Sequence, residues 1–358
     1  MVPFLGIFSY SQTISLPLTR GGEFNGGTIL KVNAANSTYE ATPMVGKIGT
    51  HTEGVSGNLT VLTANSGVYY ETSNNSLYIV AINGDRNVGL NRSTGNIFRY
   101  ELTTKETHII HEFGFHKNEG EFPLGELQNI NGTLYGVTQL GGQYGFGCIY
   151  TINPTTDEYS VLFSFNGTTD GGEPRCQLFA DGNILYGAGG RANGAPGEAY
   201  FSYDVSTSTY TALHLNNGGI TNLKGVFKRN NTLYIAAGPD IYSLDLTNPS
   251  AGTGIYYLGV GASVQLGTDP FEFTYRTGDA RWYTTFRDGG LNGTGSLARF
   301  TFSSSNPLIS VHNFQTGNLG QDPSSKLTNG LNGAIYGTAK QGSGTHAVLY
   351  QLTDVGVY

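Results

Sequence analysis

Residues 134–165 read LYGVTQLGGQYGFGCIYTINPTTDEYSVLFSF and hold three short runs of strand-forming residues. The runs are Leu134–Thr138, Cys148–Ile152 and Tyr159–Phe165, and their Tyr, Phe, Ile, Val and Thr side chains suit a half-buried pleated surface. A glycine-rich loop, GGQYGFG (141–147), joins the first two runs, and a turn, NPTTD (153–157), joins the last two. The stretch therefore predicts a small antiparallel meander without helix.

The rest of the chain repeats this unit. In each repeat an aliphatic residue or Trp precedes a Tyr, and these tyrosines lie from 48 residues (186 to 234) to 57 residues (78 to 135) apart. The six pairs are Leu77-Tyr78, Leu134-Tyr135, Leu185-Tyr186, Leu233-Tyr234, Trp282-Tyr283 and Ile335-Tyr336. A period of this length is typical of the four-stranded blade of a β-propeller.

Two further signals place a strand before each pair. Asn131-Gly132 and Asp181-Gly182 favour tight type I′ hairpin turns, which need positive φ at both central positions. Pro123, Pro174 and Pro323 each stand four residues before a leucine, as expected for the start of a strand. Each unit is thus predicted to hold four strands, which we name A to D in chain order.

The chain is predicted to fold as a single seven-bladed β-propeller of four-stranded antiparallel blades over residues 1–358, with 46–66 as an inserted loop. The N-terminal residues supply one of the seven blades, because Phe4–Ser9, Thr28–Val32 and Tyr39–Val45 match strands B, C and D. The first unit lacks an obvious A and the last an obvious D. We therefore expect the ring to close by pairing of the two chain ends, which avoids an open sheet edge.

The stretch LYGVTQLGGQYGFGCIYTINPTTDEYSVLFSFNGTTDGGEP (134–174) resembles the glycine-rich GloVer-type tandem repeat of bacterial surface proteins. The matching elements are Leu134-Tyr135-Gly136, Gly141-Gly142, Gly145, Gly147, Phe165 and Asp170-Gly171-Gly172. The similarity extends over roughly residues 77–353. It implies a propeller-like extracellular surface protein, usually exported and anchored, and it transfers no catalytic residue.

Charge and hydropathy exclude several classes of partner. The net charge is −7 and the sequence has no basic cluster, which argues against nucleic acid and anionic membranes. No run of about 18 apolar residues is present, so no membrane insertion is expected. The N-terminal sequence lacks the basic region and cleavage site of a signal peptide. Three alternatives stand: another export route, an altered coding start, or a virion component never secreted as a free chain. The expected location is the extracellular surface or a virion.

The long B–C and D–A loops are expected on one face of the ring, where propellers usually bind ligands. These loops are 83–95, 140–147, 189–197, 287–295 and 340–345, whereas the A–B turns on the other face are minimal. Five residues of the long loops are predicted to contact a protein or glycan surface, asymmetrically around the ring: Tyr144, Phe146, Arg191, Arg287 and Asp288. Assembly with other structural proteins is a further expected partnership. The alternative is that these loops are merely solvated, with glycines that serve their geometry.

No catalytic residue, metal site or cofactor is predicted. His108, His111 and His116 invite a metal interpretation, but the odd spacing of the first two in a strand favours solvated histidines on opposite faces. Asp170 and Glu173 could pair as acid and base, but the sequence DGGEP (170–174) is better explained as a turn.

The two cysteines, at positions 148 and 176, are expected to be buried thiols rather than a disulfide. The favoured function is a non-enzymatic structural or binding module displayed on an outer surface, either a virion spike or decoration protein or a cell-surface adhesin. The alternative is a propeller hydrolase or lyase that acts on polysaccharide, with paired carboxylates at the channel mouth.

Overall fold

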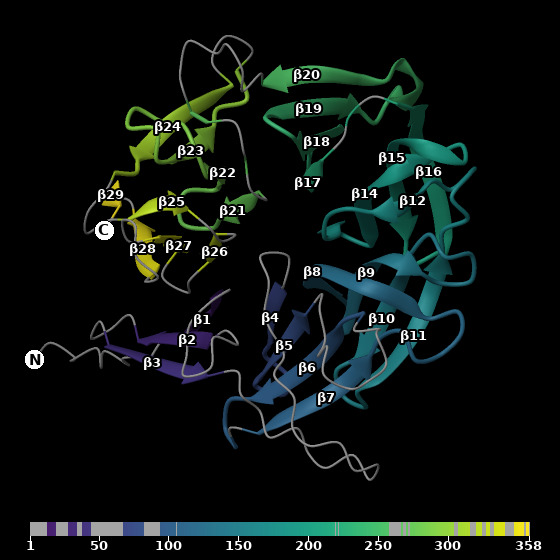
Figure 1. Ribbon diagram of the computed structural model, residues 1–358, viewed down its shortest axis with the longest axis horizontal. Coiled ribbons are helices and arrows are strands. Elements are labelled where there is room, and N and C mark those ends of the chain that lie inside the picture. Colours follow the sequence, from purple (N-terminus) through teal and green to yellow (C-terminus); the bar gives the residue numbers. More distant parts are fainter. Residues whose placement is uncertain are drawn as a thin grey trace, which may run out of the picture.

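The computed structural model describes residues 13–18, 28–33, 38–43, 67–81, 94–104, 106–218, 220, 222–257, 266–267, 270, 273–303, 307–315, 320–323, 327–329, 333–340, 347–353 and 356–357. Their strands form separate antiparallel sheets arranged around a ring, the architecture of a β-propeller (Figure 1). The single helical element among them is one turn of 3₁₀ helix, η1 (Pro249–Ala251). No helix in these ranges is long and apolar enough to cross a membrane.

Three blades come from the first half of the ring, and in each the strands follow one another from the inside outward. Blade 1 is β4 (Gly67–Glu71), β5 (Ser76–Ala81), β6 (Asn96–Glu101) and β7 (Thr107–Glu112). Blade 2 is β8 (Gly120–Ile130), β9 (Thr133–Gly141), β10 (Cys148–Asn153) and β11 (Glu158–Ser164). Blade 3 is β12 (Gly172–Pro174), β13 (Phe179–Asp181), β14 (Ile184–Ala192), β15 (Ala195–Asp204) and β16 (Thr209–Asn217).

Three more blades complete the series. Blade 4 is β17 (Leu223–Arg229), β18 (Thr232–Ala237), β19 (Asp240–Asp245) and β20 (Thr253–Tyr257). Blade 5 is β21 (Thr274–Arg276), β22 (Arg281–Phe286), β23 (Ser296–Phe300) and β24 (Leu308–Asn313). Blade 6 is β25 (Gln321–Pro323), β26 (Thr328–Asn329), β27 (Ile335–Lys340), β28 (Ala347–Thr353) and β29 (Gly356–Val357).

The prediction of seven blades is wrong, because the described strands form six. The N-terminal strands β1 (Thr13–Leu18), β2 (Thr28–Asn33) and β3 (Thr38–Pro43) form only a three-stranded sheet, which lies between blades 1 and 6 (Figure 1). The sequence argument counted B–C pairs, and such a pair can form a hairpin without the fourth strand that makes a blade.

The predicted strand at Phe4–Ser9 falls outside the described residues, as does the predicted inserted loop 46–66. The partner of β2 is instead β1, in a register that opposes Thr13 to Asn33. Closure by pairing of the chain ends is not found among the described strands either. There β1 pairs with β2, and β29 supplies a short outer strand to blade 6 by pairing with β28.

The prolines mark an interruption of the innermost strand. In blades 3 and 6 this strand is divided into two short pieces, and both pieces pair with the same second strand. In blade 2 the strand is continuous, but its register shifts between Leu124 and Gln128. The leucines four residues after the prolines, Leu127, Leu178 and Leu327, are each 1% exposed. Each proline thus marks the place where the innermost strand is interrupted or shifts its register, and the leucine four residues later lies in the core.

The residue before each of these prolines connects neighbouring blades. Phe122, Glu173 and Asp322 have φ of 58°, 48° and 48°, in the left-handed region. Their amides donate hydrogen bonds of 2.6, 2.8 and 2.8 Å to carbonyls in the B–C loop of the preceding blade. The acceptors are Thr94, Phe146 and Thr294. Because the positive φ turns the amide away from its own sheet, the first strand of one blade is tied to the loop of another.

A glycine completes each of these connections, which we call the blade clamps. Gly95, Gly147 and Gly295 follow the acceptor residues, with φ of 111°, 94° and 100°. A Cβ at any of the three would lie less than 3.0 Å from the proline ring of the next blade. The glycine carbonyls also accept hydrogen bonds of 3.0 Å from the amides of Phe113, Phe165 and Phe314. Each of these phenylalanines directly follows the outermost strand of its blade.

Five of the six hydrophobic clusters of the described residues lie between two blades, and the sixth lies on blade 1. One cluster joins blades 1 and 2 through side chains such as Tyr78 and Tyr150, and another joins blades 2 and 3 through Phe165 and Phe201. Three further clusters follow the same rule at the junctions of blades 3 and 4, 4 and 5, and 5 and 6. Each blade therefore depends on its neighbours for burial of its faces.

The clamp predicts that two glycines of one loop respond differently to substitution. Gly145→Ala should cost about 1–2 kcal/mol, because its φ of 85° is left-handed but nothing lies within 4 Å of an added Cβ. Gly147→Ala should lose about 1–3 kcal/mol more, because its Cβ would lie 2.4 Å from the carbonyl oxygen of Thr138 and 2.8 Å from Cδ of Pro174. Urea unfolding of both variants measures the difference, and equal losses would remove the clamp argument.

Candidate functional site

All five residues proposed from the sequence lie on the face formed by the B–C and D–A loops, here called the long-loop face. Tyr144 and Phe146 are in the β9–β10 loop, Arg191 is near the end of β14, and Arg287 and Asp288 follow β22. The loops at 83–95 and 340–345 lie mostly outside the described residues. The five residues thus come from blades 2, 3 and 5.

The structure brings two of the five together. The Arg191 guanidinium lies over the Phe146 ring, 5.0 Å from its centroid, and Arg191 Nε donates a 2.7 Å hydrogen bond to Glu173 Oε1. Arg191 Nη1 also donates to the Gly194 carbonyl, at 3.0 Å. Phe146 is half-buried and its ring packs against Gly167, so its side chain supports the fold as well as facing outward. Phe146 and Arg191 form a preorganised junction between blades 2 and 3.

Tyr144, Arg287 and Asp288 are exposed, and Tyr144 retains 53% of its accessible surface. Arg287 and Asp288 act on Lys224 of β17, a half-buried residue that was not picked out from the sequence. Burial, with the neighbouring Arg287 cation, lowers the pKa of Lys224 to about 8, while Asp288 opposes the shift. Lys224 belongs to no recognisable sequence motif. Its proximity to Arg287 and Asp288 is therefore visible only in the folded structure.

Two exposed apolar residues of the same face also escaped the sequence argument. Leu291 in the loop after β22 is 83% exposed, and Phe115 between β7 and β8 is 62% exposed. With Tyr144 they are the most exposed large hydrophobic side chains of the described residues. The loop motif GGxxGxG at 141–147 and 289–295 could have identified Leu291, since the two loops place matching positions at their tips.

The histidines do not converge on a common site. His108 Nε2 lies 3.3 Å from Glu101 Oε1 and 3.9 Å from Glu106 Oε2, whereas His111 Nε2 lies 3.2 Å from Glu119 Oε2. Glu101, Glu106 and His108 lie close together, but Glu101 is already ion-paired with Arg99. This cluster therefore already contains a cationic side chain in the place where a metal ion would bind.

His111 is not the solvated side chain that was expected. It is 14% exposed and stacks on Tyr159 of blade 2 with centroids 3.6 Å apart. The register of β6 and β7 shifts beside it, between Ile97 and Phe98, and such a bulge breaks the two-residue alternation on which the expectation rested.

The carboxylates at 170 and 173 serve the fold. Glu173 accepts hydrogen bonds from both Arg175 Nη2 and Arg191 Nε, each at 2.7 Å, so its charge is balanced by two guanidinium groups. Asp170 belongs to a turn closed by the Gly167 amide, which donates to the Gly171 carbonyl at 2.8 Å. Cys148 and Cys176 are both free and buried, as expected, and burial raises the pKa of the Cys148 thiol to about 11.

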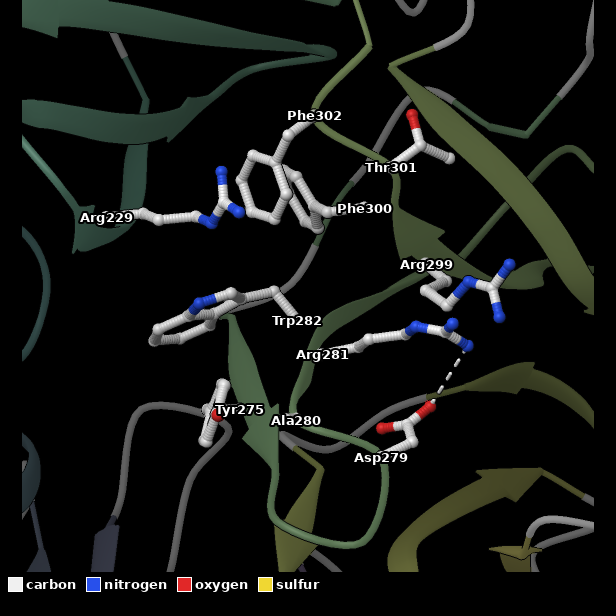
Figure 2. Close-up of a pocket in the computed structure, with 10 residues that line it drawn as sticks. All are labelled: Arg229, Tyr275, Asp279, Ala280, Arg281, Trp282, Arg299, Phe300, Thr301 and Phe302. Atoms are coloured by element: carbon white, nitrogen blue, oxygen red, sulfur yellow. Dashed lines mark ion pairs between the residues drawn. The ribbon is translucent and has the colours of Figure 1, made fainter.

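A hollow of about 650 Å³ opens on the opposite face, where the A–B and C–D turns lie. We call it the arginine–aromatic pocket (Figure 2). It is formed by the end of β17 in blade 4 and by the turns of blade 5, and its principal lining residues are Arg229, Tyr275, Asp279, Arg281, Trp282, Arg299 and Phe302. From the sequence, Trp282 is predicted only as a strand residue. The three arginines form no sequence motif, because they lie up to 70 positions apart (229 to 299).

The charges around Lys224 give a testable pH dependence. The acylation rate of its amine should follow a titration near pH 8, since only the neutral amine reacts. Arg287→Gln should move this midpoint to higher pH, because it removes a like charge, and Asp288→Asn should move it lower. Competitive labelling with mass spectrometry of the Lys224 peptide measures each midpoint. Identical midpoints in all three proteins would contradict this electrostatic assignment.

Solved propellers of low sequence identity share the fold. A putative 6-phosphogluconolactonase from Bacteroides uniformis is 11% identical, with a TM-score of 0.57 and coverage of 97% of this chain and 94% of that chain. The extracellular domain of a putative one-component system from B. thetaiotaomicron is 11% identical, with a TM-score of 0.51 and coverage of 96% and 38%. A luciferin-regenerating enzyme is 11% identical, with a TM-score of 0.50 and coverage of 83% and 93%. Identities this low establish the architecture alone.

A search of the curated proteins found no match. The profile of the Gloeobacter/Verrucomicrobia repeat family matches residues 65–243, which contain blades 1 to 3 and most of blade 4. That segment also holds the blade clamps that join blades 1, 2 and 3. The chain therefore belongs to the Gloeobacter/Verrucomicrobia repeat family.

Proposed function

We propose that this chain is a non-enzymatic binding propeller displayed on an outer surface, as a cell-surface adhesin or as a spike or decoration protein of a virion. Its long-loop face would contact a glycan or protein surface. The observation that carries the proposal is the location of Leu291, Phe115 and Tyr144, the most exposed large hydrophobic side chains of the described residues. All three lie on this face, and exposed apolar side chains lower the free energy of association when a partner covers them.

The loops that present these side chains are built for binding without rearrangement. In the loop of Tyr144 the Gly147 amide donates to the Gly141 carbonyl at 3.0 Å, and the matching bond in the loop of Leu291, from Gly295 to Gly289, is 2.9 Å. Such internal bonds fix the loop before a partner arrives, which lowers the entropic cost of association. Arg191 adds a fixed guanidinium over the ring of Phe146, which belongs to the same loop as Tyr144.

The polysaccharide hydrolase or lyase alternative has weaker support. Glycosidases use two carboxylic groups with different protonation states across a sugar bond. On the long-loop face Glu173 is held by two arginines, and His111 and Glu119 are paired with each other. These two carboxylates bind partners of their own in different blade junctions, and no contact joins them into an acid–base pair.

The display part of the proposal predicts where the native protein is found. Mass spectrometry of washed cell envelopes, of the extracellular fraction and of purified particles should detect its peptides in at least one of these samples. Enrichment over a cytosolic marker protein is the required control. Recovery in the cytosol alone would contradict display on an outer surface.

The contact part predicts the effect of removing three loop side chains. A fluorescently labelled variant with Tyr144→Ala, Leu291→Ala and Arg287→Ala should bind whole cells at least tenfold more weakly than the wild type, because aromatic and Arg anchors dominate contact energies. Its melting temperature should stay nearly unchanged, since loop tips contribute little to the core. Phe146 is left intact because its ring is packed.

A matched control removes exposed side chains elsewhere, with Tyr70→Ala, Val161→Ala and Val311→Ala. This control should bind like the wild type. Pretreatment of the cells with protease or with periodate then separates a protein partner from a glycan. If the control loses binding while the loop variant keeps it, the contact face is the wrong one.

A further inference from the structure

The arginine–aromatic pocket has an excess of positive charge in a chain whose net charge is −7. Arg229, Arg281 and Arg299 line it against one carboxylate, Asp279. Asp279 Oδ2 already accepts a 2.5 Å hydrogen bond from the Tyr283 hydroxyl and lies 3.4 Å from Nη1 of the buried Arg276. Its distance to Arg281 Nη1 is 3.7 Å. One shared aspartate therefore cannot neutralise this pocket.

Arg299 is the clearest unsatisfied group. It lies on β23 directly across from Tyr283 of β22, so it stands on the same side of the sheet as Arg281, two residues earlier in that strand. No ion pair or hydrogen bond joins its side chain to another residue of the described ranges. Two like charges near each other on one side of a sheet repel each other, and an anion between them would relieve this repulsion.

Aromatic rings line the Arg229 side of the pocket, on the other side of the blade 5 sheet from Arg281 and Arg299. Arg229 lies over the ring of Phe302, 3.9 Å from its centroid. Trp282 stacks on the buried Phe227 with centroids 4.1 Å apart, and the rings of Tyr275 and Phe179 lie 5.3 and 5.6 Å from it. Since three rings fix the half-buried indole, the part of it that lines the pocket offers an apolar surface at little entropic cost.

The order of these groups distinguishes between ligands. Arg229 stands at one end of the pocket and Arg281 with Arg299 at the other, with Trp282 and Phe302 on the Arg229 side of the centre (Figure 2). A ligand that fits must carry anionic groups at separate points along its length, with an apolar face between them. A nucleotide concentrates its charge at one end of a single flat base. An acidic oligosaccharide repeats a carboxylate on each ring, and the C–H face of each ring can pack on an aromatic side chain.

We propose that the arginine–aromatic pocket binds an acidic oligosaccharide, with uronic-acid carboxylates paired to Arg229 at one end and to Arg281 and Arg299 at the other. A sugar ring between them would pack on Trp282. Guanidinium groups suit this task because their paired N–H donors match the two oxygens of a carboxylate. The site lies on the face opposite the long loops, so it does not depend on which partner those loops contact.

Trp282 is the sole tryptophan of the chain and provides the probe. Titration of the full chain with tri-galacturonic acid should change the intrinsic fluorescence saturably, and calorimetry should give the same affinity. Neutral maltotriose, of similar size, should bind at least tenfold more weakly, because it lacks the carboxylates. Raising the salt from 0.1 to 0.5 M should weaken the acidic ligand, since the contacts are partly exposed ion pairs.

Arg299→Gln should weaken tri-galacturonate binding at least tenfold while circular dichroism and the melting temperature stay close to those of the wild type. Lys117→Gln, which removes one positive charge from an exposed loop of blade 1, should leave the affinity unchanged. Equal affinity for maltotriose, tighter binding of ATP than of tri-galacturonate, undiminished binding by Arg299→Gln, or no binding at all would each overturn the proposal.

Discussion

The blade clamp is the backbone interaction on which three junctions of the described ring depend, those of blades 1 and 2, 2 and 3, and 5 and 6. One amide, turned outward by a positive φ before a proline, donates to the loop of the preceding blade, and the glycine beside the acceptor leaves room for the proline ring. This fixes the distance and the angle between blades by backbone geometry. Side-chain clusters between the blades then fill the wedge that the clamp defines. The high glycine content is therefore a requirement of inter-blade contact as much as of the turns themselves.

Local features of the fold were readable from the sequence because they depend on short-range rules. Asn131 and Gly132 both have positive φ, as the type I′ turn requires. Gly136 lies where a Cβ would strike the ring of Tyr150, which explains why Leu-Tyr is followed by Gly in that blade. The number of blades was not readable in this way. Whether a hairpin gains a fourth strand depends on pairing across many residues, and the first described strand is β1, which begins at Thr13.

The same difference between short-range and long-range features decides which candidate site could be predicted from the sequence. The sequence placed Tyr144 and Arg191 on one face, since loop position follows from strand order. The sequence could not reveal the arginine–aromatic pocket, because Arg229 and Arg299 line the same pocket only when blades 4 and 5 pack together. It also could not anticipate that the carbonyl of Phe146 is the acceptor of a clamp, which ties a proposed contact residue to stability. Residues that serve both roles show no separate signature in a single sequence.

The clamps also have a direction along the chain. In each one the acceptor loop precedes the donor, with Thr94 before Phe122, Phe146 before Glu173 and Thr294 before Asp322. A ribosome releases the N-terminal part first, so the loop that receives each bond has left it before the strand that supplies the bond. Every clamped blade therefore emerges next to a template that has already been made. At these three junctions, assembly during synthesis can proceed one blade at a time in chain order.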